Sequence, residues 1–319
     1  MDVTMSFHTQ DWWTWWLALY LYFGGMGAAV LVVAFLSDMY IKPYPKLVVW
    51  GALSGIIMLS LGSMMLFGHL LHHMAVINVL NPMVLIRKPD AWIAWGTQFI
   101  VWMMVWGLLY ALPHLKNTWL AQNLHVVKQI WQWRWVEWLT DCCGRYSKLF
   151  GWLATVNGIG TAIYTGLLLQ SFPAVALWHN PGVPLLFTVS AFSTALAYLL
   201  VVLNIFNRRE EDTHLLHFYE RLDLMLIAAE IVIIFSFYHY MASGSESAMR
   251  SWELMWNDMG WIVGFIGLGL VVPFLIELKG VLKGWNTRIP IVTASLLVLL
   301  GGYLLRHYFM YSGVYAYPW

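Results

Sequence analysis

Long apolar stretches separated by short polar segments dominate this chain. Each stretch has about 20 residues, the length that a helix needs to cross the roughly 30 Å hydrocarbon core of a bilayer. Prolines punctuate most of the intervening segments, among them Pro43, Pro82 and Pro181. The pattern predicts eight helices, at residues 15–36, 47–70, 91–112, 149–169, 183–206, 222–242, 260–278 and 289–310. We therefore expect an all-α integral membrane protein with eight transmembrane helices.

Composition supports this assignment and excludes one class of partner. Hydrophobic residues make up 61% of the 319 residues and charged residues only 10%, whereas ordinary soluble domains carry about 25% charged residues. The formal net charge is +1 and no basic arm is present. The sequence therefore lacks the electrostatic footprint of a nucleic-acid-binding protein.

The two cysteines of the sequence, Cys142 and Cys143, are adjacent. They match neither the CxxC spacing of a metal site nor the CxxCH attachment of a c-type haem. We therefore expect free thiols on the cytoplasmic side, with no iron–sulfur cluster and no c-type haem in this chain. The sequence also lacks a nucleotide-binding loop, a Ser/His/Asp arrangement and a zinc-protease helix.

The distribution of Lys and Arg residues predicts how the helices are oriented across the membrane. Most of them lie in the first, third, fifth and seventh connections: Lys42, Lys46, Lys116, Lys128, Arg134, Arg145, Lys148, Arg208, Arg209, Arg221, Lys279, Lys283 and Arg288. The opposite side holds Arg87, Lys88 and Arg250. Because Lys and Arg concentrate in the cytoplasmic loops of membrane proteins, we expect both termini on the outer side.

This orientation brings polar and aromatic side chains from several helices to one depth near the outer surface. His69, His72 and His73 lie at the outer end of the second apolar stretch, and imidazole exchanges protons or binds metals near neutral pH. For any one of them, capping the helix end and facing interfacial water is the alternative. Other predicted helices bring further residues to this level: Trp16, Tyr20, Tyr164, His239, Arg306 and His307.

Two carboxylates mark the sixth predicted helix. Asp223 and Glu230 are seven residues apart, which is two turns on one helix face. Burying an Asp carboxylate at mid-membrane costs about 2.5–3.5 kcal/mol on insertion scales, so both should face protein or water. A proton relay from the cytoplasm and a structural bond to a neighbouring helix are equal alternatives here. On the fourth helix, Asn157 shares a polar stripe with Tyr164, where packing between helices is the alternative to a proton path.

Several stretches of the sequence resemble the NrfD/PsrC family, the quinone-reactive membrane subunits of multi-subunit respiratory oxidoreductases. The most specific stretch runs from Ala-Ile-Tyr-Thr-Gly at residues 162–166 to Pro-Leu-Leu-Phe-Thr-Val-Ser at residues 184–190. Three more are similar to the family's sixth helix, C-terminus and first helix, respectively: residues 217–223 with Glu230, residues 305–313 and residues 20–28. The resemblance covers essentially the whole sequence.

The end of the second helix departs from the family pattern. His69 and Leu70 match the Asp or His followed by Leu that many members have. His72 and His73 stand where members often have Arg and Pro. The role of His69 can therefore be carried over from the family, whereas His72 and His73 are particular to this protein.

The resemblance implies two haem-free four-helix bundles, residues 1–170 and 171–319, with menaquinone or ubiquinone bound near the outer surface in the first. A quinone couples two electrons to two protons, so its site needs hydrogen-bond donors and a proton route. The expected quinone-binding residues are His69, Tyr164, Tyr20, Trp16 and His72. The expected proton pathway uses Asp223, Glu230 and Asn157, and Arg306 is expected to hold a carboxylate or to orient the partner interface.

The resemblance also implies partners and a location. An iron–sulfur subunit of the four-cluster ferredoxin-like type would exchange electrons with the quinone at the outer face of a prokaryotic cytoplasmic membrane. Beyond it would lie a molybdopterin enzyme or a multihaem cytochrome c. Two alternatives stay open: a di-haem b-type cytochrome, suggested by His69, His239 and His307 at similar depth, and an ion or solute transporter, although internal repeats are not evident.

Overall fold

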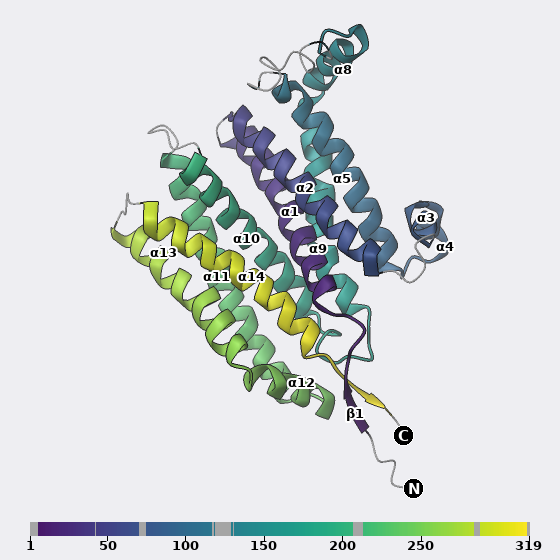
Figure 1. Cartoon of the computed structure of the whole chain (residues 1–319), viewed down its shortest axis with the longest axis vertical. Helices are drawn as coiled ribbons and strands as arrows, with labels where there is room; N and C mark the ends of the chain where they lie inside the picture. The colour runs from purple at the N-terminus through teal and green to yellow at the C-terminus, as the bar shows by residue number, and fades with distance from the viewer. Residues whose placement is uncertain are drawn as a thin grey trace.

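The computed structural model describes residues 6–41, 43–69, 75–116, 118, 129, 131–206, 213–283 and 288–317. Within this part of the protein, eight helices are long and apolar enough to cross a membrane, which confirms the predicted number (Figure 1). They are α1 (Trp15–Tyr40), α2 (Pro45–His69), α5 (Trp92–Leu115), α9 (Ser147–Gln170), α10 (Gly182–Phe206), α11 (Thr213–Ala242), the continuous pair η2 (Gly260–Val271) and α13 (Val272–Lys283), and α14 (Arg288–Tyr311).

The sixth helix is longer than the hydropathy pattern predicts. It starts at Thr213 rather than at residue 222, because the residues before Leu222 are amphipathic instead of uniformly apolar. Leu215, Leu216 and Tyr219 are buried in a cluster with residues of α1 and α10. Tertiary packing of one face therefore extends the helix beyond its apolar core.

Several short elements lie outside the predicted helices. Four of them are helical: α3 (Ala75–Leu80), α4 (Met83–Arg87), α8 (Arg134–Arg145) and α12 (Glu246–Trp256). The strands β1 (Ser6–Thr9) and β2 (Val314–Tyr317) pair antiparallel, with Phe7 opposite Ala316. Figure 1 shows that this pairing holds the two ends of the chain side by side, at the end of the molecule where α12 lies.

Helix α1 is the centre of the molecule and contacts α2, α9, α10 and α14. Glycines allow its closest contact, which is with α2. A Cβ atom added at Gly27 would lie 2.9 Å from the carbonyl oxygen of Gly55, and one added at Gly55 would lie 2.7 Å from Cγ of Leu31. Small residues in membrane helices let backbones approach in this way, since packing rather than water exclusion holds such helices together.

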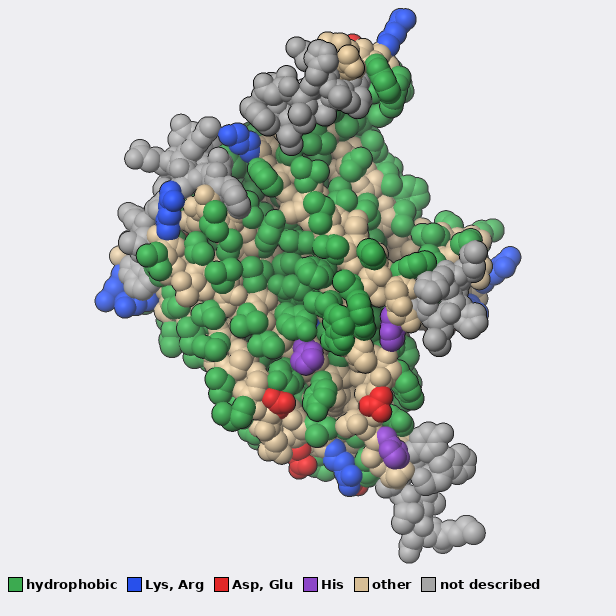
Figure 2. Space-filling view, viewed as in Figure 1, with side chains coloured by type: hydrophobic (Ala, Val, Ile, Leu, Met, Phe, Trp, Pro, Cys, Tyr) green, Lys and Arg blue, Asp and Glu red, His purple; other side chains and the backbone are tan. Residues whose placement is uncertain are grey.

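The distribution of side chains over the surface fits a protein that sits in a bilayer. Figure 2 shows hydrophobic side chains across the middle of the visible face, with Lys and Arg towards its ends. Large apolar side chains are exposed along the outer helices, for example Met64, Met225 and Leu275, at 70%, 67% and 56% of their surface. In water such a surface would aggregate, whereas lipid tails cover it without cost.

The tight contact between α1 and α2 leads to a stability prediction. Gly55→Ala should lower the free energy of unfolding by about 1–3 kcal/mol, the usual cost of overpacking a well-packed core. Gly68→Ala on the same helix is the matched control, because a Cβ there meets no atom within 4 Å. Thermal unfolding of the detergent-solubilised protein measures both variants. Equal Tm values for the two would contradict the packing argument.

Candidate functional site

Two tyrosines from different helices form a hydrogen-bonded pair inside the protein. The hydroxyl oxygens of Tyr20 on α1 and Tyr164 on α9 are 3.0 Å apart. Both side chains are almost completely buried, at 2% and 1% exposure. One hydroxyl donates to the other, so the accepting hydroxyl keeps its own hydrogen for a further acceptor. The pair therefore offers one O–H donor to a ligand.

A glycine on α5 creates the space that Tyr164 occupies. A Cβ atom added at Gly96 would lie 2.1 Å from the Tyr164 ring, closer than any real contact. On the same face of α9, a Cβ at Gly160 would lie 3.1 Å from the ring of Phe99. The two helices thus approach closely enough to hold the phenol of Tyr164 in one position.

Tyr20 lies at the wall of a large apolar cavity. The cavity has a volume of about 480 Å³ and lies between α1, α2, α3 and α5. The polar side chains in its wall are Tyr20, Ser63 and Thr97, and the rest of the wall is apolar: Met64, Leu66, Phe67, Val76, Val79, Leu80, Ile93, Ile100, Val101 and Met104. A flat, mostly apolar molecule with a few hydrogen-bond acceptors suits such a cavity.

Two side chains of α5 fix the short segment that closes one side of this cavity. Gln98 is buried and donates from Nε2 to the carbonyl oxygen of Leu80, at 2.9 Å. Trp95 donates from Nε1 to the carbonyl oxygen of Pro89, at 3.0 Å. These bonds satisfy backbone oxygens next to α3 and α4, and they position Val76 and Val79 of α3 in the cavity wall.

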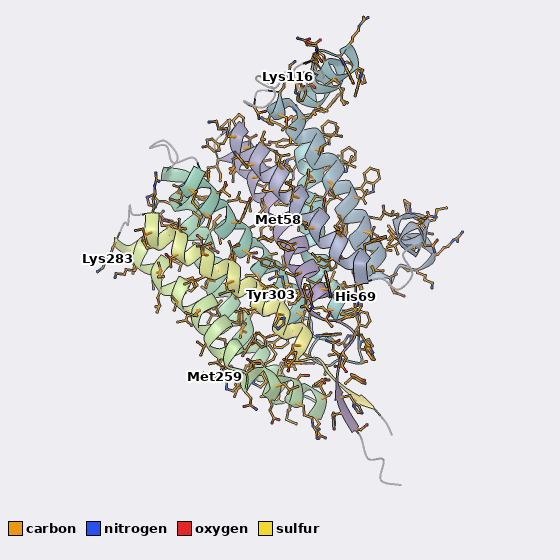
Figure 3. The ribbon with its side chains drawn as sticks, in the orientation of Figure 1. Met58, His69, Lys116, Met259, Lys283 and Tyr303 are labelled. Carbon is orange, nitrogen blue, oxygen red and sulfur yellow. The ribbon has the colours of Figure 1, made fainter. Side chains whose placement is uncertain are left out.

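Two of the other expected quinone-binding residues, His69 and Trp16, do not line the cavity. His69 is the last residue of α2 and is half-buried. It follows Leu66 by three residues, which places it on the same helix face, at the end of α2 turned away from Lys116 and Lys283 (Figure 3). Trp16 is 41% exposed and stacks on Trp15 at 4.0 Å. His72 lies outside the described residues.

Arg306 lies deep inside the protein, in the half formed by the later helices. Its side chain has no exposed surface. It donates from Nη1 to the hydroxyl of Ser190 at 3.1 Å and to the carbonyl oxygen of Gly302 at 2.6 Å, and from Nη2 to the carbonyl oxygen of Phe187 at 3.3 Å. Since it does not reach the surface, its charge acts on groups within the protein.

The two predicted carboxylates lie buried on α11, and Glu230 is a neighbour of Arg306. Glu230 is 5% exposed, lies within hydrogen-bonding reach of Ser190 and interacts electrostatically with Arg306. Asp223 has no exposed surface and accepts a hydrogen bond of 2.6 Å from the hydroxyl of Ser193. The structure thus connects the two predicted carboxylates to hydroxyls of α10.

Asn157 is not part of this connection in the structure. Its side chain donates from Nδ2 to the carbonyl oxygen of Leu153 in its own helix, at 2.8 Å. Helix α9 packs against α1, α5 and α10, whereas Asp223 and Glu230 lie on α11. The bond within one helix accounts for the Asn157 amide donor without a ligand.

Three buried polar residues of this region are not among those that the sequence predicts. Glu277 on α13 and Glu220 on α11 are buried, at 7% and 6% exposure, and Gln98 is buried beside the cavity. An ionisable or amide side chain within an apolar helix can be recognised from sequence alone, and it indicates a residue that is buried in protein for a functional or structural reason. Glu277 and Gln98 both lie within the predicted helices, so this signal was present for them.

Two of the three histidines that suggested haem ligation, His239 and His307, lie in separate aromatic surroundings. His239 is exposed beside Tyr238. His307 lies between the rings of Tyr303 and Tyr311, with centroid distances of 5.9 and 6.4 Å. Among the described residues, no three His, Cys, Asp or Glu side chains gather as a metal ion would need. Both cysteines are free thiols, as predicted.

Comparison with known proteins agrees with this arrangement of helices. Residues 4–318 match the family described as polysulphide reductase, NrfD. The sequence is 26% identical to the protein NrfD of Escherichia coli, over 98% of both proteins. It is also 26% identical to a polysulfide reductase component of Wolinella succinogenes, over 50% of this protein and 51% of that relative. A selenate reductase component of Mesobacillus selenatarsenatis is 20% identical over 93% of this protein and 75% of its own length.

The family match spans nearly every residue, and the apolar helices, the tyrosine pair and the buried carboxylates come from all parts of that span. This chain therefore belongs to the NrfD family of multi-pass membrane proteins.

Proposed function

We propose that this protein is the membrane anchor and quinone-reactive electron-transfer subunit of a multi-subunit respiratory oxidoreductase in a prokaryotic cytoplasmic membrane. The observation that carries the proposal is the buried Tyr20–Tyr164 pair at the wall of an apolar cavity of about 480 Å³. Relatives named as single components of a polysulfide reductase and of a selenate reductase support the role of one subunit among several.

The cavity suits menaquinone or ubiquinone for a physical reason. A quinone has two carbonyl oxygens on a flat ring and a long apolar tail, so it needs few donors and much apolar wall. Tyr20 donates to one carbonyl oxygen, and Tyr164 orients Tyr20 through the hydrogen bond of 3.0 Å. His69, at the end of α2, is the candidate for the second carbonyl oxygen. Phe67 and Leu66 pack on the ring, and the tail leaves between apolar helices.

We further propose that the protein inserts with both termini on the outer side. Residues 1–170 then form the bundle that holds the quinone, and residues 171–319 form the bundle that holds the carboxylates. The strands β1 and β2 with helix α12 lie at the outer end, where a four-cluster ferredoxin-like iron–sulfur subunit would dock. That subunit passes electrons between the quinone and a molybdopterin enzyme or a multihaem cytochrome c.

The protons of the reaction exchange with the cytoplasmic side in this proposal. Reduction of a quinone by two electrons takes up two protons, and oxidation of a quinol releases them. Asp223 and Glu230 carry protons along α11, with the hydroxyls of Ser193 and Ser190 between them. Arg306 holds Glu230 in place electrostatically. Electron transfer thereby becomes coupled to proton movement across the membrane.

The quinone site is tested by Tyr164→Phe. The change removes the hydrogen bond to Tyr20, worth about 1 kcal/mol, and should lower kcat/KM for a short-chain quinone analogue roughly fivefold. His69→Ala should also slow turnover while the complex stays assembled. The assay uses the purified complex, with co-purification of the partner subunits as the check on assembly.

Tyr198→Phe is the matched control, because Tyr198 is a half-buried tyrosine of α10 that is not in the cavity wall. It should leave turnover unchanged. Wild-type turnover in both Tyr164→Phe and His69→Ala would exclude this cavity as the quinone site.

Proton coupling is tested by Glu230→Gln, which keeps the size of the side chain but cannot carry a proton. Turnover should fall, or electron transfer should continue without proton movement, in proteoliposomes that contain the complete complex. Glu246→Gln is the control, since Glu246 is 59% exposed on α12 and pairs with Arg250. A proton stoichiometry equal to that of the wild type in Glu230→Gln would refute this route.

A further inference from the structure

Three carboxyl groups lie together between α11 and α13, in the half of these helices that is predicted to be cytoplasmic. Asp223 and Glu220 belong to α11 and Glu277 to α13, and each is less than 10% exposed. Asp223 receives a hydrogen bond from Ser193. Its second oxygen, one oxygen of Glu220 and both oxygens of Glu277 are buried without a donor among the described residues. Glu277 in particular is a buried acid outside the proton route proposed above.

Asp223 and Glu277 lie within hydrogen-bonding reach of each other. Ionised carboxylates only accept hydrogen bonds, so two facing carboxylates repel and leave each other unsatisfied. Burial away from water adds to this cost. One proton between them replaces the repulsion with a charge-assisted O–H···O bond. The pair is therefore stable with a single shared proton, as in other sites where two carboxyl groups meet.

A small cavity lies next to this pair on the side that leads to the Lys- and Arg-rich connections. Its volume is about 10 Å³, and Glu220 and Glu277 line it together with Gly280 and Pro290. A volume of this size is close to what one water molecule needs, and such a water requires polar partners. The two carboxyl groups supply them. The wall also includes the start of α14 near Arg288, on the predicted cytoplasmic side.

A histidine connects this end of the cluster to solvent. His217 contacts Glu220, with 3.0 Å between Nδ1 and Oε2, and its side chain is 41% exposed. Imidazole exchanges protons readily near neutral pH. His217 and Glu220 thus lie between the solvent and the buried pair.

Hydroxyl groups of α10 lie between the other end of the cluster and Glu230. Asp223 and Glu230 are seven residues apart on α11, so about 10.5 Å of helix separates them. Ser193 and Ser190 lie one turn apart on α10; the first donates to Asp223, and the second is in reach of Glu230. Hydroxyl groups both donate and accept, so the two serines can pass a proton along this interval.

We propose that Asp223 and Glu277 form a proton-sharing carboxyl pair through which protons pass between the cytoplasm and Glu230. This deepens the proposed function and rests on it. A proton that enters at His217 and Glu220 joins the pair, and the pair releases its earlier proton through Ser193 and Ser190 to Glu230. The pair holds one proton before and after each step, and quinol oxidation reverses the order.

Glu277→Gln tests the proposal in proteoliposomes that contain the complete complex. A glutamine still donates a hydrogen bond to Asp223, so a purely structural contact survives the change, whereas proton sharing does not. We expect the rate of cytoplasmic proton exchange, read with a pH-sensitive dye, to fall several-fold, and quinone-linked turnover to fall with it even when an uncoupler is present, because an uncoupler opens no other route from the cytoplasm to the buried quinone. Glu277→Asp should restore proton exchange at least in part. Glu137→Gln, an exposed acid of α8, should behave as the wild type.

Normal proton exchange in Glu277→Gln would overturn the proposal. If that variant fails to assemble, Ser193→Ala decides instead, because it leaves both carboxyl groups in place: lost proton exchange supports the route, and normal exchange overturns it. Failure of the proposed function looks different, since the wild-type complex would then show no quinone-dependent turnover at all.

Discussion

Polar side chains inside apolar helices must find their partners within the protein, because lipid tails offer none and an unsatisfied group costs several kcal/mol. This constraint organises the molecule. The hydroxyls of Tyr20 and Tyr164 satisfy each other, Arg306 bonds to Ser190 and to two backbone oxygens, and Asp223 accepts from Ser193. Each of these pairings joins two helices or fixes one side chain.

Helix α1 contacts both the cavity that Tyr20 lines and the surroundings of Arg306. Its N-terminal turns carry Tyr20 in the cavity wall, and Gly25 lies little more than a turn further along the same helix. A Cβ atom added at Gly25 would lie 3.5 Å from Nη2 of Arg306 and 3.8 Å from Cγ2 of Thr165, the residue that follows Tyr164. The absence of a side chain at Gly25 lets the guanidinium approach the helix that carries Tyr20. Arg306, which interacts electrostatically with Glu230, therefore lies against the helix that carries Tyr20.

Sequence alone predicts the parts of this structure that depend on local composition. Continuous apolar runs are sufficient to place all eight membrane helices, since length and hydropathy decide whether a helix can span a bilayer. Asp223 and Glu230 are predictable because a carboxylate in such a run needs a special reason to be there. Tyr164 and Tyr20 are predictable from the motifs around them and from their common depth.

Contacts between distant segments of the sequence cannot be predicted from local composition. Nothing near Val76 or Val79 signals that α3 forms a cavity wall, because the position of α3 depends on the bond from Gln98 to Leu80. Sequence marks Glu277 as a polar residue in an apolar helix, but its neighbour Asp223 is known only once α13 packs against α11. Depth also fails to distinguish Trp16 from Tyr20: both lie near the start of α1, but Trp16 is 41% exposed whereas Tyr20, one turn further into the protein, is 2% exposed.

The proposed function depends on quinone binding in the cavity between α1, α2, α3 and α5. Photolabelling of the complete complex in membranes with a photoreactive quinone analogue, followed by peptide mass spectrometry, locates the bound quinone. We predict labels on the α2 segment around Ser63 and Phe67 and on the α5 segment around Thr97 and Val101, removed by excess unlabelled quinone. Competable labelling confined to other helices, such as α11 or α14, would contradict this assignment.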